Sequence, residues 1–286
     1  MGSHTIDESM QNWKLTLTYD GTNYYGWQVQ PGLSTIQGEL QAAIQRVLSA
    51  RWGTAPLPQG SGRTDAGVHA LGQVASLELA APIPCENLSR ALNRTLPPAI
   101  RVLEARVVPT AFHARHSAIA KTYEYRIFRG ELCSPFLAPW VHHCRWPLDF
   151  DALRDAANAV IGEHDFLSLA ASDPDLANRS EEDPESIPDA AANAEIPTRS
   201  TIRTIFSSEW AESPGDLLIY RVRGNGFLHH MVRNLVGTML EIARGQFPAE
   251  SMPTILEARS RSVAGPTAPA RGLFLHSVEY PEDSQL

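Results

Sequence analysis

The sequence predicts an α+β fold of two pseudo-duplicated halves, each with a mainly antiparallel sheet flanked by helices. Strand-like segments with alternating apolar residues are interspersed throughout with segments whose apolar residues recur at helical spacing. A proline-containing segment, residues 134–139, interrupts this alternation near the middle of the chain. Short turn-like connections such as residues 213–216 favour antiparallel neighbours.

The 286 residues divide into four predicted parts. We expect a disordered N-terminal tail or tag remnant at 1–12, a first α/β half at 13–133 and a second α/β half at 139–281. Within the second half, residues 173–200 hold eight acidic residues and two arginines but few large apolar residues. Because such a segment buries too little apolar surface to offset ordering entropy, we expect a flexible acidic insertion.

The first half is expected to contain four strands and two helices. Ser34 and Gln37 have the spacing of a capping box, and the apolar residues that follow recur at helical spacing. Two prolines, Pro97 and Pro98, end the second helix. The expected strands are residues 15–19, 74–79, 100–108 and 122–128, and the expected helices are residues 34–51 and 86–96.

The second half repeats the alternation. Its longest expected helix, residues 227–244, carries an apolar stripe, and Arg233 lies off that stripe. The expected strands are residues 141–146, 202–210, 217–222 and 273–280, and the expected helices are residues 149–161, 227–244 and 252–261.

Composition indicates a globular protein of a reducing compartment. No apolar run reaches the roughly 18 residues of a membrane helix, so no membrane association is expected, and no secretory signal is visible. Three cysteines without CxxC spacing favour free thiols, which is typical of the cytoplasm.

The charge of the chain is unevenly distributed. Its net charge is −8, whereas nucleic-acid binders are usually basic. The segment 173–200 contributes −6 of this charge, and residues 90–130 carry a local excess of +6. The sequence therefore remains compatible with a nucleic-acid ligand, and the affinity for such a ligand is expected to fall steeply with salt.

The loop of residues 62–70 is the strongest candidate for a functional site. Asp65 stands between Gly62 and Gly67, with Arg63 and His69 close by. Glycines allow tight turns and a close approach to a ligand, so such a loop can present a carboxylate at a cleft. Asp next to Gly also caps ordinary turns, and the loop alone does not separate the two interpretations.

This loop closely resembles the active-site motif of the TruA family of tRNA pseudouridine synthases. Seven further stretches resemble the same family in the required order, so the resemblance covers nearly the whole chain. They are residues 19–28, 112–115, 121–126, 162–166, 203–205, 225–234 and 268–273.

The resemblance implies a pseudouridine synthase fold with an active-site cleft between the halves. It also implies isomerisation of uridines at positions 38–40, in the tRNA anticodon stem-loop, by a protein that is often a homodimer. Asp65 would be the catalytic carboxylate, as nucleophile or as base, with Arg233 as its cationic partner. A cation is expected there because burial alone disfavours an ionised carboxylate.

Two further residues are expected to bind substrate. The resemblance places Tyr123 against the target uracil, whereas Tyr125, on the same strand face, is expected in the core. Arg63 would fill the space that a flipped base leaves in the stem. His69 is expected to fix the loop by hydrogen bonding.

The reaction is an isomerisation without net redox change or hydrolysis, so we expect no cofactor and no metal. The histidine pairs of the sequence are not spaced with cysteines or carboxylates as metal ligands. Two alternatives remain open: a non-catalytic RNA-binding protein with paired RRM-like halves, and a hydrolase of glycosidic bonds. The first lacks the expected aromatic strand motifs, and the second usually needs another carboxylate.

Overall fold

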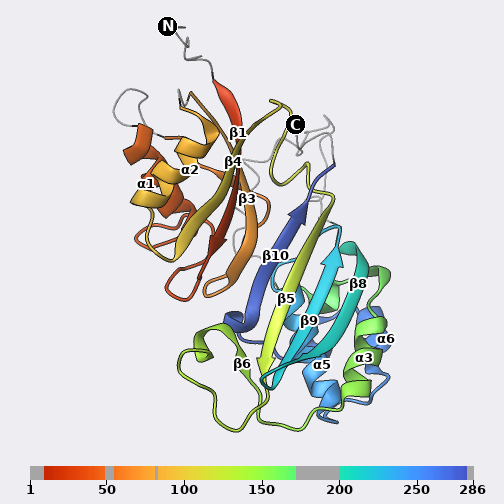
Figure 1. The fold of residues 1–286 in the computed structure, drawn as a ribbon. Coiled ribbons are helices and arrows are strands. Elements are labelled where there is room, and N and C mark those ends of the chain that lie inside the picture. The colour runs from red at the N-terminus through yellow and green to blue at the C-terminus, as the bar shows by residue number, and fades with distance from the viewer. Residues whose placement is uncertain (1–9, 49–54, 81–82, 172–199, 282–286) are drawn as a thin grey trace, which may run out of the picture.

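The computed structural model describes residues 10–48, 55–80, 83–171 and 200–281. Their strands form one ten-stranded sheet (Figure 1). Eight strands follow the order β4-β1-β3-β10-β5-β9-β8-β7, while β2 (Gln59–Gly60) pairs with β3 and β6 (His142–His143) pairs with β5. The predicted α+β class with mainly antiparallel strands is confirmed, because only the pairs β10–β3 and β5–β6 are parallel.

The sheet has two regions (Figure 1). The first region consists of β1 (Gln11–Tyr19), β3 (His69–Leu79) and β4 (Ile100–Val108), with helices α1 (Ile36–Leu48) and α2 (Cys85–Thr95). The strands of the second region are β10 (Leu273–Glu279), β5 (Ala120–Phe128), β9 (Leu217–Gly224), β8 (Ile202–Ser213) and β7 (Gly162–Asp165). Its helices are α3 (Phe150–Asn158), α5 (Met231–Ala243) and α6 (Ser251–Glu257).

The C-terminal strand β10 joins the two regions. It pairs with β3 at only two positions, Phe274 with His69 and Leu275 with Ala70, and along most of its length with β5. Strand β5, which the predicted first half 13–133 includes, therefore lies within the second region. The spatial division falls between β3 and β10, not at residues 134–139.

Helix α5 begins at Met231, four residues later than the sequence predicted. His230 precedes it with a φ of 58°, in the left-handed region, and the Met231 amide donates to the Leu228 carbonyl as in a turn. A left-handed residue cannot continue a right-handed helix, so the chain turns sharply before α5 starts.

The predicted capping box at Ser34 is wrong. Thr35 occupies the capping position instead, and its Oγ1 accepts from the Gly38 amide at 3.3 Å. The side chain of Gln37 contacts other segments: it accepts from the Val29 amide and donates to the Pro58 carbonyl. Because the Gln37 side chain makes these tertiary hydrogen bonds, it does not complete the capping box.

Two other differences concern the ends of segments. Strand β1 begins at Gln11, inside the predicted tail 1–12, because its first residues pair with β3 and β4. The buried side-chain Nδ2 of Asn12 also donates to the carbonyls of Pro109 and Phe112. The predicted acidic insertion lies outside the described residues except for Ser200, as does the end of the first predicted helix. Within the described ranges, no helix has the length and apolar character to cross a membrane.

Candidate active site

The Asp65 loop connects β2 to β3 and rests on a network of buried polar side chains. Gln73, which is fully buried, donates to the Gly62 carbonyl at 3.0 Å and accepts from the Ser61 hydroxyl at 2.7 Å. The hydroxyls of Tyr19 and Thr64 are 2.8 Å apart. Satisfied buried polar groups hold a backbone in one conformation, because any displacement leaves them without partners.

The segment of residues 20–28 packs over this loop. The Trp27 amide donates to the Thr64 carbonyl, and the Gly67 amide donates to the Tyr24 carbonyl. Gly26 has a φ of 83°, and a Cβ there would come within 2.5 Å of the Thr64 carbonyl oxygen. The segment of residues 20–28 thus positions the Asp65 loop, and glycine is required at this contact.

His69 holds the loop in place by hydrogen bonds, as expected from the sequence. Its ring is buried, with Nδ1 accepting from the Gly21 amide at 3.1 Å and Nε2 lying 3.2 Å from the Arg271 carbonyl. Burial lowers the pKa of His69, which agrees with a neutral ring that donates to that carbonyl from Nε2.

Asp65 and Arg233 form an ion pair, as the sequence predicted. Arg233 Nη1 lies 2.9 Å from Asp65 Oδ2, and both side chains are about four-fifths buried. A second bond holds the guanidinium independently of the aspartate, because Arg233 Nε donates to the Ala268 carbonyl at 2.8 Å. Although the two residues are 168 positions apart, the carboxylate meets a cation that is already fixed in place.

Two histidines also contact the carboxylate, and sequence reasoning missed this. His229 Nε2 lies 3.6 Å from Asp65 Oδ1, and His230 Nε2 lies 3.2 Å from Asp65 Oδ2. Burial lowers the pKa of His230, so at neutral pH its ring is mostly neutral. The sequence could have predicted this contact, because His229 and His230 lie four and three residues before Arg233.

The expectation that no carboxylate accompanies the histidine pairs is wrong at this point. Asp65, His229 and His230 offer ligand atoms within 4.8 Å of one another, a spacing that a metal ion could use. Arg233 already places a positive charge on the same carboxylate. Since that cation opposes a second one, we keep the prediction of a metal-free reaction.

Asp65, Arg233, Tyr123 and Arg63 all line one cavity of about 1000 Å³. The structure therefore brings the four predicted site residues together. Asp65 is the only carboxylate among the described residues of the lining. A hydrolase with two catalytic carboxylates is thus not supported here.

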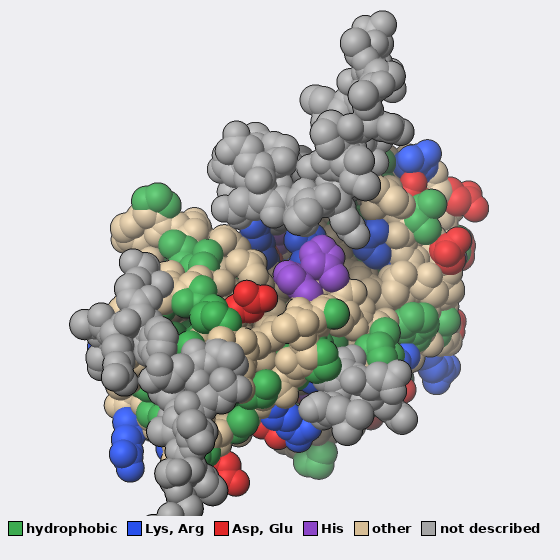
Figure 2. All heavy atoms as spheres, turned by 90° about the horizontal axis from the view of Figure 1, so that it is seen from above, with side chains coloured by type: hydrophobic (Ala, Val, Ile, Leu, Met, Phe, Trp, Pro, Cys, Tyr) green, Lys and Arg blue, Asp and Glu red, His purple; other side chains and the backbone are tan. Residues whose placement is uncertain are grey.

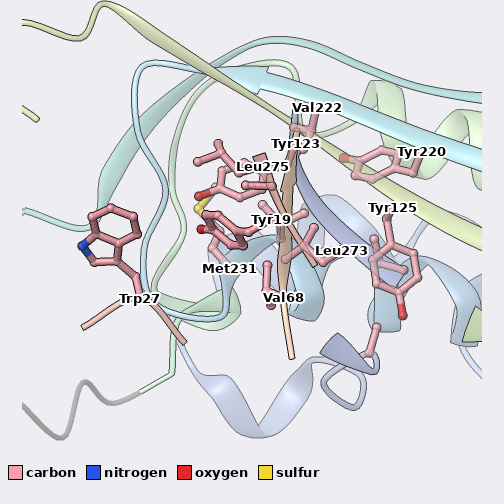
Figure 3. Packing of buried hydrophobic residues seen from close by; sticks show 14 of the residues in the cluster. Tyr19, Trp27, Val68, Tyr123, Tyr125, Tyr220, Val222, Met231, Leu273 and Leu275 are labelled. Carbon is pink, nitrogen blue, oxygen red and sulfur yellow. The ribbon is translucent and has the colours of Figure 1, made fainter. Parts of the chain in front are cut away.

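The two tyrosines of β5 differ in their surroundings (Figure 3). Tyr123 lies beside Tyr19, and its ring meets Phe227 edge-on with centroids 5.0 Å apart. Tyr125 is fully buried, and its hydroxyl donates to the Pro269 carbonyl at 2.9 Å. Burial, reinforced by the negative charge of Asp65, raises the pKa of Tyr123, so Tyr123 is present as a neutral phenol.

The basic excess of residues 90–130 is not a single patch. Arg106 pairs with Glu104, and Arg101 donates to the Pro97 carbonyl, both away from the cavity. Of the eight basic residues in that segment, only Arg115 and Lys121 line it. Figure 2 shows histidine side chains in the middle of one face, with Lys and Arg side chains beside them.

The site thus combines a carboxylate held by an arginine with a tyrosine ring in the same cavity, on a mainly antiparallel sheet. The chain matches the tRNA pseudouridine synthase family over residues 16–117 and 189–281. It belongs to the tRNA pseudouridine synthase family.

Curated relatives agree with this assignment. The chain is 50% identical to tRNA pseudouridine synthase A of Solibacter usitatus, over 95% of this chain and all of that protein. It is 40% identical to the proteins of the same name from Maridesulfovibrio salexigens and Anoxybacillus flavithermus, over 96% and 95% of this chain and 92% and 99% of theirs. A chain of a solved Cbf5–Nop10–Gar1 complex aligns at a TM-score of 0.29 and 12% identity, covering 79% of this chain and 53% of that one, which is too low to carry an argument.

Proposed function

We propose that this protein converts uridine to pseudouridine in tRNA. The observation that carries the proposal is the ion pair of Asp65 and Arg233 on the wall of a cavity large enough for a nucleotide. Family membership and the names of the relatives support tRNA as the substrate.

The reaction needs one ionised carboxylate. The C1′–N1 bond of the nucleotide breaks, the uracil turns, and C1′ bonds to C5; C5 then loses its proton and N1 gains one. Asp65 acts as the nucleophile at the sugar or as the base that starts cleavage, and Arg233 keeps it charged. No electron or water molecule is consumed, so no cofactor is required.

Tyr123 and Arg63 are proposed to bind the substrate. The Tyr123 ring provides a surface against which the uracil stacks, and its neutral phenol is a hydrogen-bond donor. Arg63 precedes Asp65 by two residues on the same wall, where it can contact the strand from which the base is flipped.

The resemblance to the TruA family supports the finer assignment. We propose uridines 38–40 of the anticodon stem-loop as targets, a homodimer that the tRNA spans, and a cytoplasmic location. The three cysteines are free thiols, which agrees with a reducing compartment.

Release of tritium from C5-labelled uridine in bulk tRNA tests the proposal. Isomerisation releases it, whereas an RNA-binding module or a glycosidic hydrolase does not. Mapping the modified positions tests the anticodon stem-loop assignment, and light scattering tests the dimer. Unchanged tritium content after prolonged incubation at high protein concentration would refute the proposed activity.

A further inference from the structure

Two side-chain nitrogens converge on one oxygen of the Asp65 carboxylate. Arg233 Nη1 lies 2.9 Å from Oδ2, and Nε2 of His230 lies 3.2 Å from the same atom. The other oxygen, Oδ1, is 3.6 Å from Nε2 of His229, which is longer than a hydrogen bond. The described surroundings of the carboxylate are therefore unequal for its two oxygens.

The backbone at the start of α5 determines where the His230 ring lies. His230 has a φ of 58° and a ψ of 3°, and its carbonyl accepts from the Asn234 amide at 2.9 Å, as at the start of a helix. The fully buried Asn234 side chain donates to the Leu169 carbonyl at 2.8 Å, which fixes this first turn. The left-handed region is uncommon for a residue with a side chain, so the surroundings impose this conformation on His230.

The His230 ring is packed and suited to donate a hydrogen bond. It lies against the ring of His229, with centroids 3.9 Å apart and an angle of 31° between the ring planes. Burial lowers the pKa of His230, although the charge of Asp65 opposes this. A neutral imidazole has one protonated and one unprotonated nitrogen, so it donates to Oδ2 only as the tautomer with hydrogen on Nε2.

We propose that His230 is a positioning residue, which donates its Nε2 hydrogen to Oδ2 of Asp65 and so leaves Oδ1 as the oxygen that reacts with the substrate. The proposal rests on the proposed function and adds to it the residue that orients the carboxylate. As a nucleophile, Oδ1 forms a bond to C1′ while the C1′–N1 bond breaks and its electron pair leaves with the uracil. As a base, Oδ1 removes a proton from the sugar, the C–H electron pair forms a new carbon–carbon π bond, and the uracil leaves with the C1′–N1 pair.

Two donors on one oxygen do what a single donor cannot. A carboxylate held only by Arg233 can still rotate about its Cβ–Cγ bond, whereas a second donor on Oδ2 fixes the direction of Oδ1 as well. A neutral imidazole does this without adding a second positive charge to that of Arg233. Because misplacement of a reacting atom slows the reaction more than it weakens binding, loss of His230 should lower the rate and not the affinity for tRNA.

Nitrogen-15 nuclear magnetic resonance of protein labelled in its histidine rings tests the hydrogen bond without an activity measurement. The chain has ten histidines, and the His230 signals are those missing from a His230→Asn variant. We expect a protonated Nε2 in the parent protein at neutral pH, with a chemical shift that changes in Asp65→Ala. An unprotonated Nε2 would overturn the proposal, because its lone pair would then face the carboxylate. A shift that is the same in Asp65→Ala would overturn it as well.

Variants of His230 give an independent readout. Asparagine tolerates the left-handed conformation but is too short to reach Oδ2, so His230→Asn should lower the single-turnover rate of tritium release about tenfold, at unchanged tRNA affinity and melting temperature. Glutamine can place its amide nitrogen near the position of Nε2, so His230→Gln should recover most of this loss. His164→Asn, on β7 and outside the lining of the cavity, is the control and should match the parent protein.

A His230→Asn protein that reacts at the parental rate would refute the positioning role. A His230→Gln protein of normal melting temperature that is as slow as His230→Asn would also refute it, because the donor would then be irrelevant. Absence of tritium release from the parent protein would instead refute the proposed function. The resonance measurement does not depend on turnover, so the two failures are distinguishable.

Discussion

The first and second regions of the sheet supply opposite parts of the same site. The first region contributes the Asp65 carboxylate, and the second contributes the cation Arg233, the imidazoles of His229 and His230, and the Tyr123 ring. The two regions share only two β3–β10 residue pairs by strand hydrogen bonding. The ion pair between Asp65 and Arg233 therefore forms only when both regions are folded and joined.

The two regions also hold their site residues by different means. Asp65 lies on a glycine-containing loop held by side-chain hydrogen bonds, chiefly those of Gln73. Arg233 lies on α5, a helix in which eleven of thirteen residues are buried. Buried hydrogen bonds thus fix the carboxylate side of the site, and helix packing fixes the arginine side.

Removing the carboxylate of the first region should have the largest effect. Asp65→Asn or Asp65→Ala is expected to abolish tritium release while leaving tRNA affinity nearly intact, since the nucleophile or base is lost and the binding surface is not. The matched control is Asp216→Asn, on an exposed turn outside the cavity, which should keep full turnover. Turnover retained in the Asp65 variants would remove Asp65 from the mechanism.

Changing the second region's cation should have the next largest effect. Arg233→Lys keeps the charge but cannot reproduce the two contacts, to Asp65 and to the Ala268 carbonyl, that a fixed guanidinium makes. We expect turnover in single-turnover assays to fall about 100-fold, with tRNA affinity little changed. Arg244→Lys, at the far end of α5 and paired with Glu241, is the control and should have normal turnover.

The two tyrosines of β5 provide a smaller and more selective comparison. Tyr123→Phe should bind tRNA and react slowly, and Tyr123→Ala should also lose stacking of about 1–3 kcal/mol. Tyr125→Phe removes the bond to the Pro269 carbonyl and should lower the free energy of unfolding by about 1 kcal/mol at normal turnover. If Tyr125→Phe slows turnover as much as Tyr123→Phe, the assignment of Tyr123 loses its support.

Local patterns predicted most of the fold. Strand β4 was expected with its observed bounds, and α2 within one residue at each end, because their periodicity and flanking prolines act locally. The failures lie where distant contacts decide the conformation, as at Gln37, which bonds across to Val29 and Pro58, and at His230 before α5. The short edge strand β7 went unrecognised because four residues carry too little periodicity.

The residues of the candidate site could be predicted only where they belong to a motif that resembles the family. The resemblance nominated Asp65 and Arg233, and no local pattern could have paired residues so far apart in sequence. His229 and His230 were missed as contacts of Asp65 because their closeness to the carboxylate depends on the tertiary fold.

The last comparison concerns stability and not turnover, and it sets the buried His69 of the first region against the half-buried His142 of the second. Both ring nitrogens of His69 have hydrogen-bond partners. The Nδ1 atom of His142 is buried, and it has no hydrogen-bond partner among the described residues. Burial, with the charges of Arg271 and His143, lowers the pKa of His142 to about 4.

Because the unfolded chain binds a proton near pH 6.5 and the folded protein resists it down to about pH 4, stability should be lost as pH falls through this window. His142→Phe, which keeps a ring beside Tyr125, removes the titrating group. The parent protein should therefore lose about 1 kcal/mol more than this variant between pH 7 and pH 5, after allowance for partial exposure. Urea unfolding at both pH values measures this difference; His69 is present in both proteins and cancels. Equal losses in the two proteins would show that His142 already binds its proton in the folded state.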